Sequence, residues 1–109
     1  MRISDVFYKG KKAGMLIQNE QGKFSFQYTE QWINLHKIPL SLTFPIQKEP
    51  FFSDFLFPFF FHLLPEGRNK KLICRNLKID ETDDFGLLLH TANNDSIGAI
   101  KIIRNDGIR

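Results

Sequence analysis

The sequence is poor in cysteine and in long apolar runs. Cys74 is the one cysteine among 109 residues, which excludes an internal disulfide and fits a reducing compartment, so we expect a cytoplasmic protein. The longest strongly apolar run, residues 55–64, is interrupted by Pro58 and His62, and it is shorter than the roughly twenty residues of a membrane-spanning helix. Residues 1–20 carry charges throughout and contain no apolar signal-peptide segment. We therefore expect no membrane association.

Motifs that bind nucleotides or perform catalysis are also absent. The Gly-Lys pairs at Gly10 and Gly22 lack the glycine spacing and the hydroxyl residue of a phosphate-binding loop. Cys74 has no histidine nearby in the sequence, which favours a buried structural thiol over a nucleophile. The three histidines are isolated from one another, at His36, His62 and His90. The sequence therefore predicts a protein that is not an enzyme and has no cofactor.

Acidic residues crowd one short stretch, where Asp80, Glu81, Asp83 and Asp84 stand close together. Negative charge is favourable at the start of a helix because it interacts with the helix dipole. No histidine or cysteine stands at metal-ligand spacing beside these carboxylates. We interpret the cluster as a helix start and expect no metal site.

The net charge is weakly positive, +3 at pH 7, from fifteen basic and twelve acidic residues. Proteins that bind phosphate usually concentrate positive charge on one face, so this balance alone does not indicate nucleic acid. A helix expected over residues 68–77 has the outward basic residues Arg68, Lys70, Lys71 and Arg75, with Lys78 after it. Its expected inward residues are Leu72, Ile73 and Leu77. Either simple solvation or nucleic-acid binding explains this basic face.

The first third of the chain predicts an antiparallel meander. Two β-leaning runs, residues 2–8 and 13–18, flank a turn in which Gly10 can adopt a positive φ. A second turn ending at Gly22 leads to residues 23–28, where polar and apolar side chains alternate with the period of a half-buried strand.

The remaining predicted elements are short. Thr29 is a candidate N-cap for a helix over residues 30–35, and residues 40–44 alternate like a strand between two prolines. A helix after the acidic cluster, a turn at 93–96, a strand at 98–103 and a polar tail at 104–109 follow. We predict an α+β fold: one compact domain over residues 1–109, whose antiparallel sheet packs with three or four short helices.

The most unusual stretch is residues 51–68, FFSDFLFPFFFHLLPEGR, whose first eleven positions hold seven of the twelve phenylalanines. We expect one helix here, capped by Ser53 or Asp54 and with a first turn distorted by Pro58. Apolar residues would cover roughly two-thirds of its circumference, whereas a surface helix needs a stripe of little more than about 100°. The helix is then either buried on nearly all sides or covered on one face by a partner.

Several short motifs follow one another in a recognisable order. They are Tyr28 with Trp32, Pro39-Leu40-Ser41-Leu42-Thr43-Phe44-Pro45, Leu63-Leu64-Pro65-Glu66-Gly67, Phe85 with Leu87-Leu88, and Asp95-Ser96-Ile97-Gly98-Ala99. Together with the early meander they resemble the N-terminal subdomain of HipA-type serine/threonine kinase toxins, over nearly the whole chain. Each motif is weak alone, but five in the same order make a chance match improbable.

HipA proteins continue into a kinase body, whereas this sequence ends after the first subdomain. It is therefore similar to HipS, the small free-standing component of tripartite HipB–HipS–HipT toxin–antitoxin systems. The resemblance implies that HipT is a kinase toxin lacking this subdomain and that HipB is a helix-turn-helix DNA-binding protein. It also implies a ternary complex in which the small component docks on the kinase and restrains it. We expect a bacterial, non-catalytic antitoxin that meets DNA only indirectly.

The segment expected to contact the kinase consists of Leu64, Pro65, Glu66, Gly67 and Arg68. An apolar start and a polar end match the apolar centre and polar rim of protein interfaces, with Leu64 and Arg68 as anchors and Glu66 orienting them. Some members of the family carry tryptophan where this sequence has Arg68, whose guanidinium can stack and can pair with carboxylates. Two alternatives stay open: a small nucleic-acid-binding domain acting through residues 68–78, and a toxin fragment with no independent role.

Overall fold

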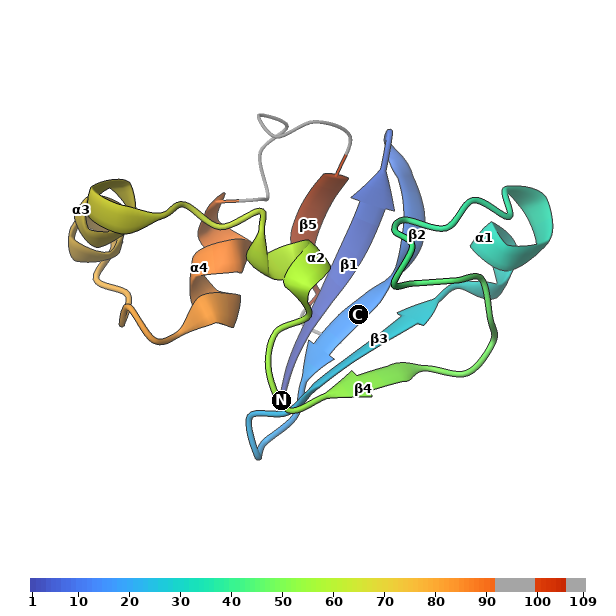
Figure 1. The fold of residues 1–109 in the computed structure, drawn as a ribbon, viewed down its shortest axis with the longest axis horizontal. Helices are drawn as coiled ribbons and strands as arrows, with labels where there is room; N and C mark the ends of the chain where they lie inside the picture. Colours follow the sequence, from blue (N-terminus) through green and yellow to red (C-terminus); the bar gives the residue numbers. More distant parts are fainter. Residues whose placement is uncertain (92–99, 106–109) are drawn as a thin grey trace.

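Five strands form one antiparallel sheet in the computed structural model, which describes residues 1–91 and 100–105. The strands lie in the order β4-β3-β2-β1-β5 (Figure 1). Their bounds are Arg2–Tyr8 (β1), Lys11–Gln18 (β2), Phe24–Tyr28 (β3), Phe51–Ser53 (β4) and Ile100–Asn105 (β5). The helices of the described residues are Glu30–Leu35 (α1), Pro58–Phe61 (α2), Gly67–Leu77 (α3) and Asp84–Thr91 (α4). The predicted α+β fold is confirmed.

The predicted meander is also confirmed, and turn chemistry explains its two connections. Lys9 and Gly10 alone join β1 to β2, and both have a positive φ, 52° and 83°, as a type I′ hairpin turn requires. Asn19 holds the next connection, because its side-chain oxygen accepts hydrogen bonds from the backbone N–H groups of Gln21 and Lys23, each at 2.9 Å. These local bonds favour the register in which the first three strands pair.

The last strand returns to the sheet beside the first. β5 pairs antiparallel with β1, and Ile102 lies opposite Val6. The strand continues to Asn105, so Arg104 and Asn105 belong to the sheet and not to the predicted polar tail. The side-chain amide of Asn105 donates to the Asp5 carboxylate at 3.1 Å. The predicted turn at 93–96 and the rest of the tail lie outside the described residues.

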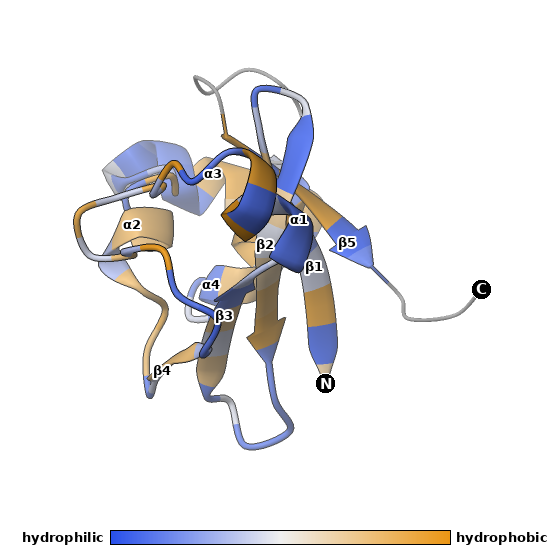
Figure 2. Ribbon diagram, turned by 90° about the vertical axis from the view of Figure 1, so that its right-hand side faces the viewer, coloured by the Kyte–Doolittle hydropathy of each residue, from blue (hydrophilic) through white to orange (hydrophobic). Residues whose placement is uncertain are grey.

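Three helices, α2, α3 and α4, lie on one side of the sheet (Figure 2). The strand side chains that are fully buried include Val6, Leu16, Phe26 and Ile102, which are neighbours across the paired strands. On the helical side, α4 contributes a continuous buried run from Phe85 to Leu89. The core therefore lies between one face of the sheet and the helices that cover it.

The Phe-rich stretch is not one helix, which corrects the prediction from sequence. Its start forms the edge strand β4, which pairs with β3, and helix α2 covers only Pro58–Phe61. Ser53 does not cap a helix, because its Oγ accepts a hydrogen bond from the backbone N–H of Phe55 (3.1 Å) in a turn. Pro58 stands in the first turn of α2, where its missing N–H costs no intrahelical bond, so it begins the helix instead of distorting one.

This break divides the phenylalanines between core and surface. Phe60 is fully buried, with its ring centroid 5.6 Å from that of Phe26 and 5.7 Å from that of Phe44. By contrast, Phe52 and Phe55 are 76% and 79% exposed. The apolar excess of this stretch therefore lies at the surface, which excludes a helix buried on all sides.

The strand predicted at residues 40–44 is wrong. The backbone N–H of Phe44 donates to the Ser41 carbonyl at 3.0 Å, and Ser41 Oγ accepts from the N–H of Thr43 at 3.1 Å, which closes a tight turn. The Tyr28 hydroxyl holds this turn, since it accepts from the N–H of Leu40 (2.9 Å) and donates to the Phe44 carbonyl. Phe44 is thereby buried in the core, so the segment packs on the sheet without joining it.

One ion pair connects the start of the sheet to the start of α4. The Arg2 guanidinium donates to both carboxylate oxygens of Asp83, at 2.7 and 3.1 Å, and its carbon lies 5.1 Å from the centre of the Phe85 ring. Asp83 also accepts from the backbone N–H of Gly86 (3.1 Å), as expected at a helix start. The hydrogen bond from Arg2 is the largest cause that lowers the pKa of Asp83.

Replacing Arg2 by methionine is expected to lower the free energy of unfolding at pH 7 by roughly 1 kcal/mol. A carboxyl whose pKa is lowered by folding stabilises the protein above its unfolded pKa of about 3.9, and this contribution is lost as the pH falls through the folded value. The variant should therefore lose less stability than the parent on acidification below about pH 4. Urea titrations at several pH values measure both effects.

Lys23→Met is the matched control, because Lys23 and Asp54 form an ion pair at 3.4 Å whose side chains are mostly exposed. We expect that variant to keep the parent's stability to within about 0.5 kcal/mol at every pH. An Arg2 variant whose acid transition coincides with that of the parent would contradict the role given to the Arg2–Asp83 pair.

Candidate partner-binding site

The turn of residues 64–68, predicted to bind a partner, connects α2 to α3 with a fixed backbone. Leu64 continues from α2 through a hydrogen bond from its N–H to the Phe61 carbonyl (3.1 Å). Pro65 then restricts φ, Glu66 is extended (φ −125°, ψ 159°), and Gly67 has a φ of 59°, which glycine adopts at little cost. Glu66 occupies the N-cap position of α3, but its side chain makes no capping hydrogen bond. Its carboxylate is therefore available to another molecule.

The five predicted residues differ in what they present to solvent. Leu64 is only 6% exposed and packs in the hydrophobic core, so its side chain anchors the start of the turn to the domain. Pro65 is half-buried, whereas Glu66, Gly67 and Arg68 are exposed. Arg68 has no ion-pair partner among the described residues. The turn thus combines a buried apolar base with two opposite charges at its surface.

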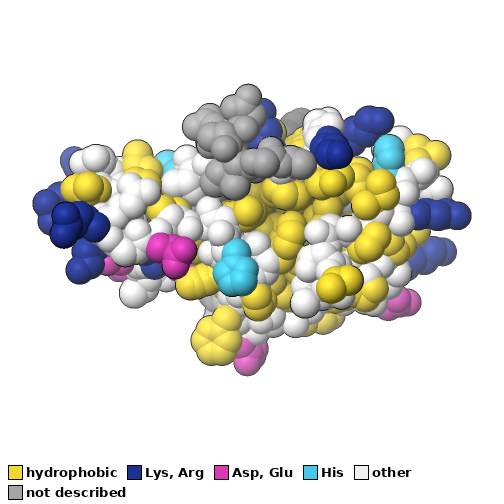
Figure 3. Space-filling view, turned by 45° about the horizontal axis from the view of Figure 1, so that its top comes forward, with side chains coloured by type: hydrophobic (Ala, Val, Ile, Leu, Met, Phe, Trp, Pro, Cys, Tyr) yellow, Lys and Arg dark blue, Asp and Glu magenta, His cyan; other side chains and the backbone are white. Residues whose placement is uncertain are grey.

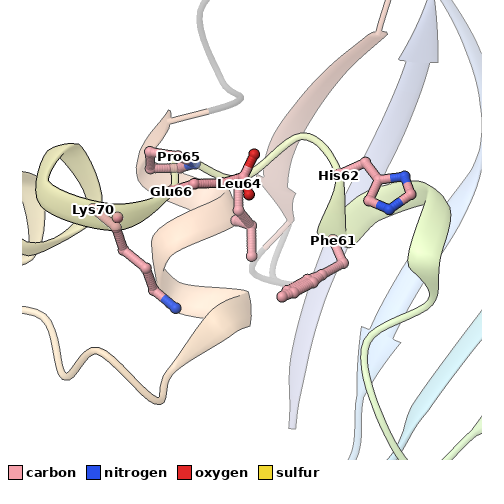
Figure 4. Close-up of a pocket in the computed structure, with 7 residues that line it drawn as sticks. Phe61, His62, Leu64, Pro65, Glu66 and Lys70 are labelled. Carbon is pink, nitrogen blue, oxygen red and sulfur yellow. The ribbon is translucent and has the colours of Figure 1, made fainter.

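Two pockets flank this turn and share its first residues as a wall. One, of about 470 Å³, is lined by Phe61, His62, Leu64, Pro65, Glu66, Gly67 and Lys70. Figure 4 shows Phe61 and Leu64 extending toward one another there, from α2 and from the turn, with Lys70 coming from α3. The other, of about 670 Å³, lies against α3 and α4 and includes Ile73 and His90. The first pocket combines apolar walls with the charged residues Glu66 and Lys70, and this combination suits a protein interface.

Lys70 has a structural partner, which separates it from the other basic residues of α3. Its Nζ lies 3.8 Å from the Asp84 carboxylate at the start of α4, and its side chain is mostly buried. Lys70 therefore helps to hold α3 on α4. No such pair involves Lys71, Arg75 or Lys78 within residues 1–91 and 100–105.

Helix α3 is oriented differently from the prediction. Cys74 is buried, as expected for a structural thiol, and Ile73 is half-buried, but Leu72 and Leu77 are 49% and 44% exposed. Side chains two residues apart in a helix differ in direction by about 200° around the helix axis. Leu72 therefore points nearly opposite to both Lys70 and Cys74. Because Cys74 is buried and Lys70 is half-buried beside Asp84, Leu72 lies on the outward side of α3, and hydrophobicity alone did not reveal this.

The other titratable residues that the sequence brought into question have local structural roles. The His36 ring lies 4.5 Å from the Trp32 ring, and His90 Nδ1 is 3.0 Å from the Gly86 carbonyl oxygen. Asp80 accepts hydrogen bonds from Thr82, which lower the pKa of its carboxyl. The acidic cluster thus serves the start of α4, and within the described residues no three potential ligands gather around a metal position.

Reasoning from the sequence missed two residues of the site, Phe61 and His62, because it assigned them to one long helix. Pro58 was the available signal, since proline favours the first turn of a helix and therefore indicates that a new helix starts there, after the strand-forming residues 51–53. Across the described part of the chain, no helix has the length and apolar character needed to cross a membrane.

Comparison with known proteins gives consistent matches. The HipA N-terminal domain family matches residues 4–103. A protein of Haemophilus influenzae is 41% identical over 102 residues, which cover 94% of this chain and 92% of that protein. A putative kinase of Sinorhizobium fredii, Y4mE, is 31% identical over 107 residues, which cover 97% of this chain but only 25% of the kinase.

A solved structure described as the N-terminal domain of HipA toxin has the same fold. It is 37% identical to this chain, with a TM-score of 0.73, and the match covers 99% of this chain and 96% of that one. Sequence and fold therefore agree over nearly the whole chain, and the resemblance inferred from the short motifs is confirmed. This chain belongs to the HipA N-terminal domain family.

Proposed function

We propose that this protein is a non-catalytic antitoxin of the HipS type, which binds a HipA-like (HipT) serine/threonine kinase toxin and restrains it. The proposal rests on the occurrence of the same domain both as part of a longer kinase and as a small separate protein. It makes up a quarter of a putative kinase and nearly all of a small Haemophilus protein. A kinase that lacks the domain can receive it from a separate chain, which would then act as a regulator. A HipB-like helix-turn-helix protein completes the proposed cytoplasmic complex.

The turn of residues 64–68 is the proposed kinase contact. Its support is geometric: the backbone is fixed by Pro65 and the adjoining helices, Leu64 is buried, and Glu66 and Arg68 have no ion-pair partner among residues 1–91 and 100–105. Leu64 and Pro65 line both neighbouring pockets. Interfaces place arginine at their energetically important positions and surround an apolar centre with polar groups. A preorganised turn of this kind binds with little loss of conformational entropy.

Co-purification tests the proposal most simply. The protein is co-expressed with a HipA-like kinase that lacks this domain, with an affinity tag on the kinase only. We expect a stable complex and a lower rate of phosphate transfer by the complex than by the kinase alone. A kinase that is purified without this protein, or whose activity is unchanged when it is bound, contradicts the proposed function.

We also expect the isolated protein to show no kinase or ATPase activity, because its sequence contains no phosphate-binding loop and no catalytic motif. The measurement is release of inorganic phosphate from Mg·ATP, compared with a mock preparation from cells without the gene. Turnover above the mock level that a point substitution in this chain abolishes would show the prediction to be wrong.

A further inference from the structure

The outward side of α3 combines three cations with one exposed leucine. Arg68, Lys71 and Arg75 stand at positions i, i+3 and i+7, so they fall within an arc of about 60° on a helical wheel. All three side chains are exposed, and the helix spans about 10 Å from Arg68 to Arg75. Leu72, 49% exposed, is one turn from both arginines. Figure 3 shows Lys and Arg side chains gathered at this end of the molecule.

These cations are not balanced within the described structure. Helix α3 contains no acidic residue, and none of the three has an ion-pair partner among residues 1–91 and 100–105. The pairs Arg68–Lys71 and Lys71–Arg75 lie one turn apart, where like charges repel and destabilise a helix. An acidic surface placed against this face would relieve that repulsion.

Leu72 indicates which kind of acidic surface fits. Binding to a nucleic-acid backbone depends on neutralising phosphates, and an exposed aliphatic side chain beside the cations adds nothing to it. A protein interface, by contrast, buries an apolar residue at its centre and places charged residues at its rim. Leu72, which borders the cationic arc about 40° from Arg68, therefore favours a protein surface that has carboxylates with an apolar contact beside them.

We propose that the face formed by Arg68, Lys71, Leu72 and Arg75 is a second contact for the kinase, and that it docks on an acidic surface with an apolar patch. This inference rests on the proposed function and extends its site, since Arg68 belongs to both the turn and the face. The turn sets how long the complex lasts, and the cationic face speeds its formation, because complementary charge acts mainly on the association rate.

The test compares association rates of the kinase with three forms of the protein at about 50 and 300 mM salt. The first form is the parent, and the second is Lys71→Glu with Arg75→Glu. The third, Lys11→Glu with Lys48→Glu, changes the charge equally at exposed residues outside α3. We expect the α3 variant to associate roughly tenfold more slowly than the parent at low salt, and the control to stay within about twofold. Far-UV circular dichroism establishes that all three are folded.

Leu72→Ser separates a protein partner from DNA. It should speed dissociation of the kinase about threefold or more, while leaving binding to a 20-base-pair DNA duplex unchanged. An α3 variant that associates with the kinase as the control does, or a Leu72 variant with the parent's dissociation rate, overturns this inference and leaves the proposed function standing. Sub-micromolar DNA binding that the α3 variant abolishes would assign the face to nucleic acid instead. A parent protein that does not bind the kinase overturns both proposals.

Discussion

Replacing Phe60 by alanine is expected to lower the free energy of unfolding by about 3–5 kcal/mol, as truncation of a fully buried phenylalanine usually does. Phe60 has no exposed surface, and its ring lies within 5.1–6.4 Å of those of Phe59, Phe44, Phe26 and Phe57. The neighbours belong to three separate segments of the chain, so the cavity left by the ring cannot close without moving all of them. Such a loss is a large part of the roughly 5–15 kcal/mol typical of a domain.

Phe55→Ala is the matched control for this prediction. The same atoms are removed only five positions away, but Phe55 is 79% exposed, so its loss should change stability by no more than about 0.5 kcal/mol. Urea unfolding followed by tryptophan fluorescence of Trp32, which is buried, measures both variants. Equal losses for Phe55 and Phe60 would contradict the division of the Phe-rich stretch into a core part and a surface part.

Replacing Arg68 by alanine is expected to weaken kinase binding by about 1–2 kcal/mol, or roughly 5- to 30-fold in Kd, while leaving stability unchanged. Arg68 is exposed and unpaired among the described residues, so its removal breaks no contact within the domain. Lys11→Ala removes one exposed positive charge elsewhere and should bind like the parent. Titration calorimetry gives the Kd values.

Leu64 and Lys70 need a different treatment from Arg68. Both are predominantly buried, and Lys70 pairs with Asp84, so alanine at either position changes the fold's own contacts as well as any contact with a partner. Weaker kinase binding by these two variants is evidence for a direct contact only when the loss of binding is larger than their lower folding stability accounts for. If Arg68→Ala binds the kinase as tightly as Lys11→Ala does, while a Lys71 variant binds more weakly, then the contact lies on the basic side of α3 and not at the turn.

The sequence predicted those elements whose signals are local. The β1–β2 hairpin follows from a turn around Gly10, and α1 follows from the cap at Thr29, whose Oγ1 accepts from the N–H of Trp32 at 3.1 Å. These signals act between residues a few positions apart, so no knowledge of the rest of the chain is needed. The buried run in α4 was equally clear from its leucines.

The errors occurred where a distant partner decides the conformation. Residues 51–53 form a strand because β3 offers them an edge, although their composition also suits a helix. Residues 40–44 alternate like a strand, but the hydroxyl of Tyr28 holds them in a turn. Leu72 points outward because the opposite side of α3, which carries buried Cys74 and the Lys70 that pairs with Asp84, packs against the rest of the domain. In each case the deciding contact joins segments far apart in the sequence, and local pattern does not contain it.

The proposal that this protein restrains a kinase through the turn of residues 64–68 is tested most directly by titrating kinase activity. The titration uses the parent protein and the double variant Glu66→Ala, Arg68→Ala. Both substituted residues are exposed, and neither side chain has a partner among the described residues, so the fold should be unaffected. We expect the parent to lower the rate of phosphate transfer to a saturating minimum, and the variant to reach that minimum only at a roughly tenfold or higher concentration. A parent that leaves the rate unchanged at saturation, or a variant that inhibits as well as the parent, would contradict the account.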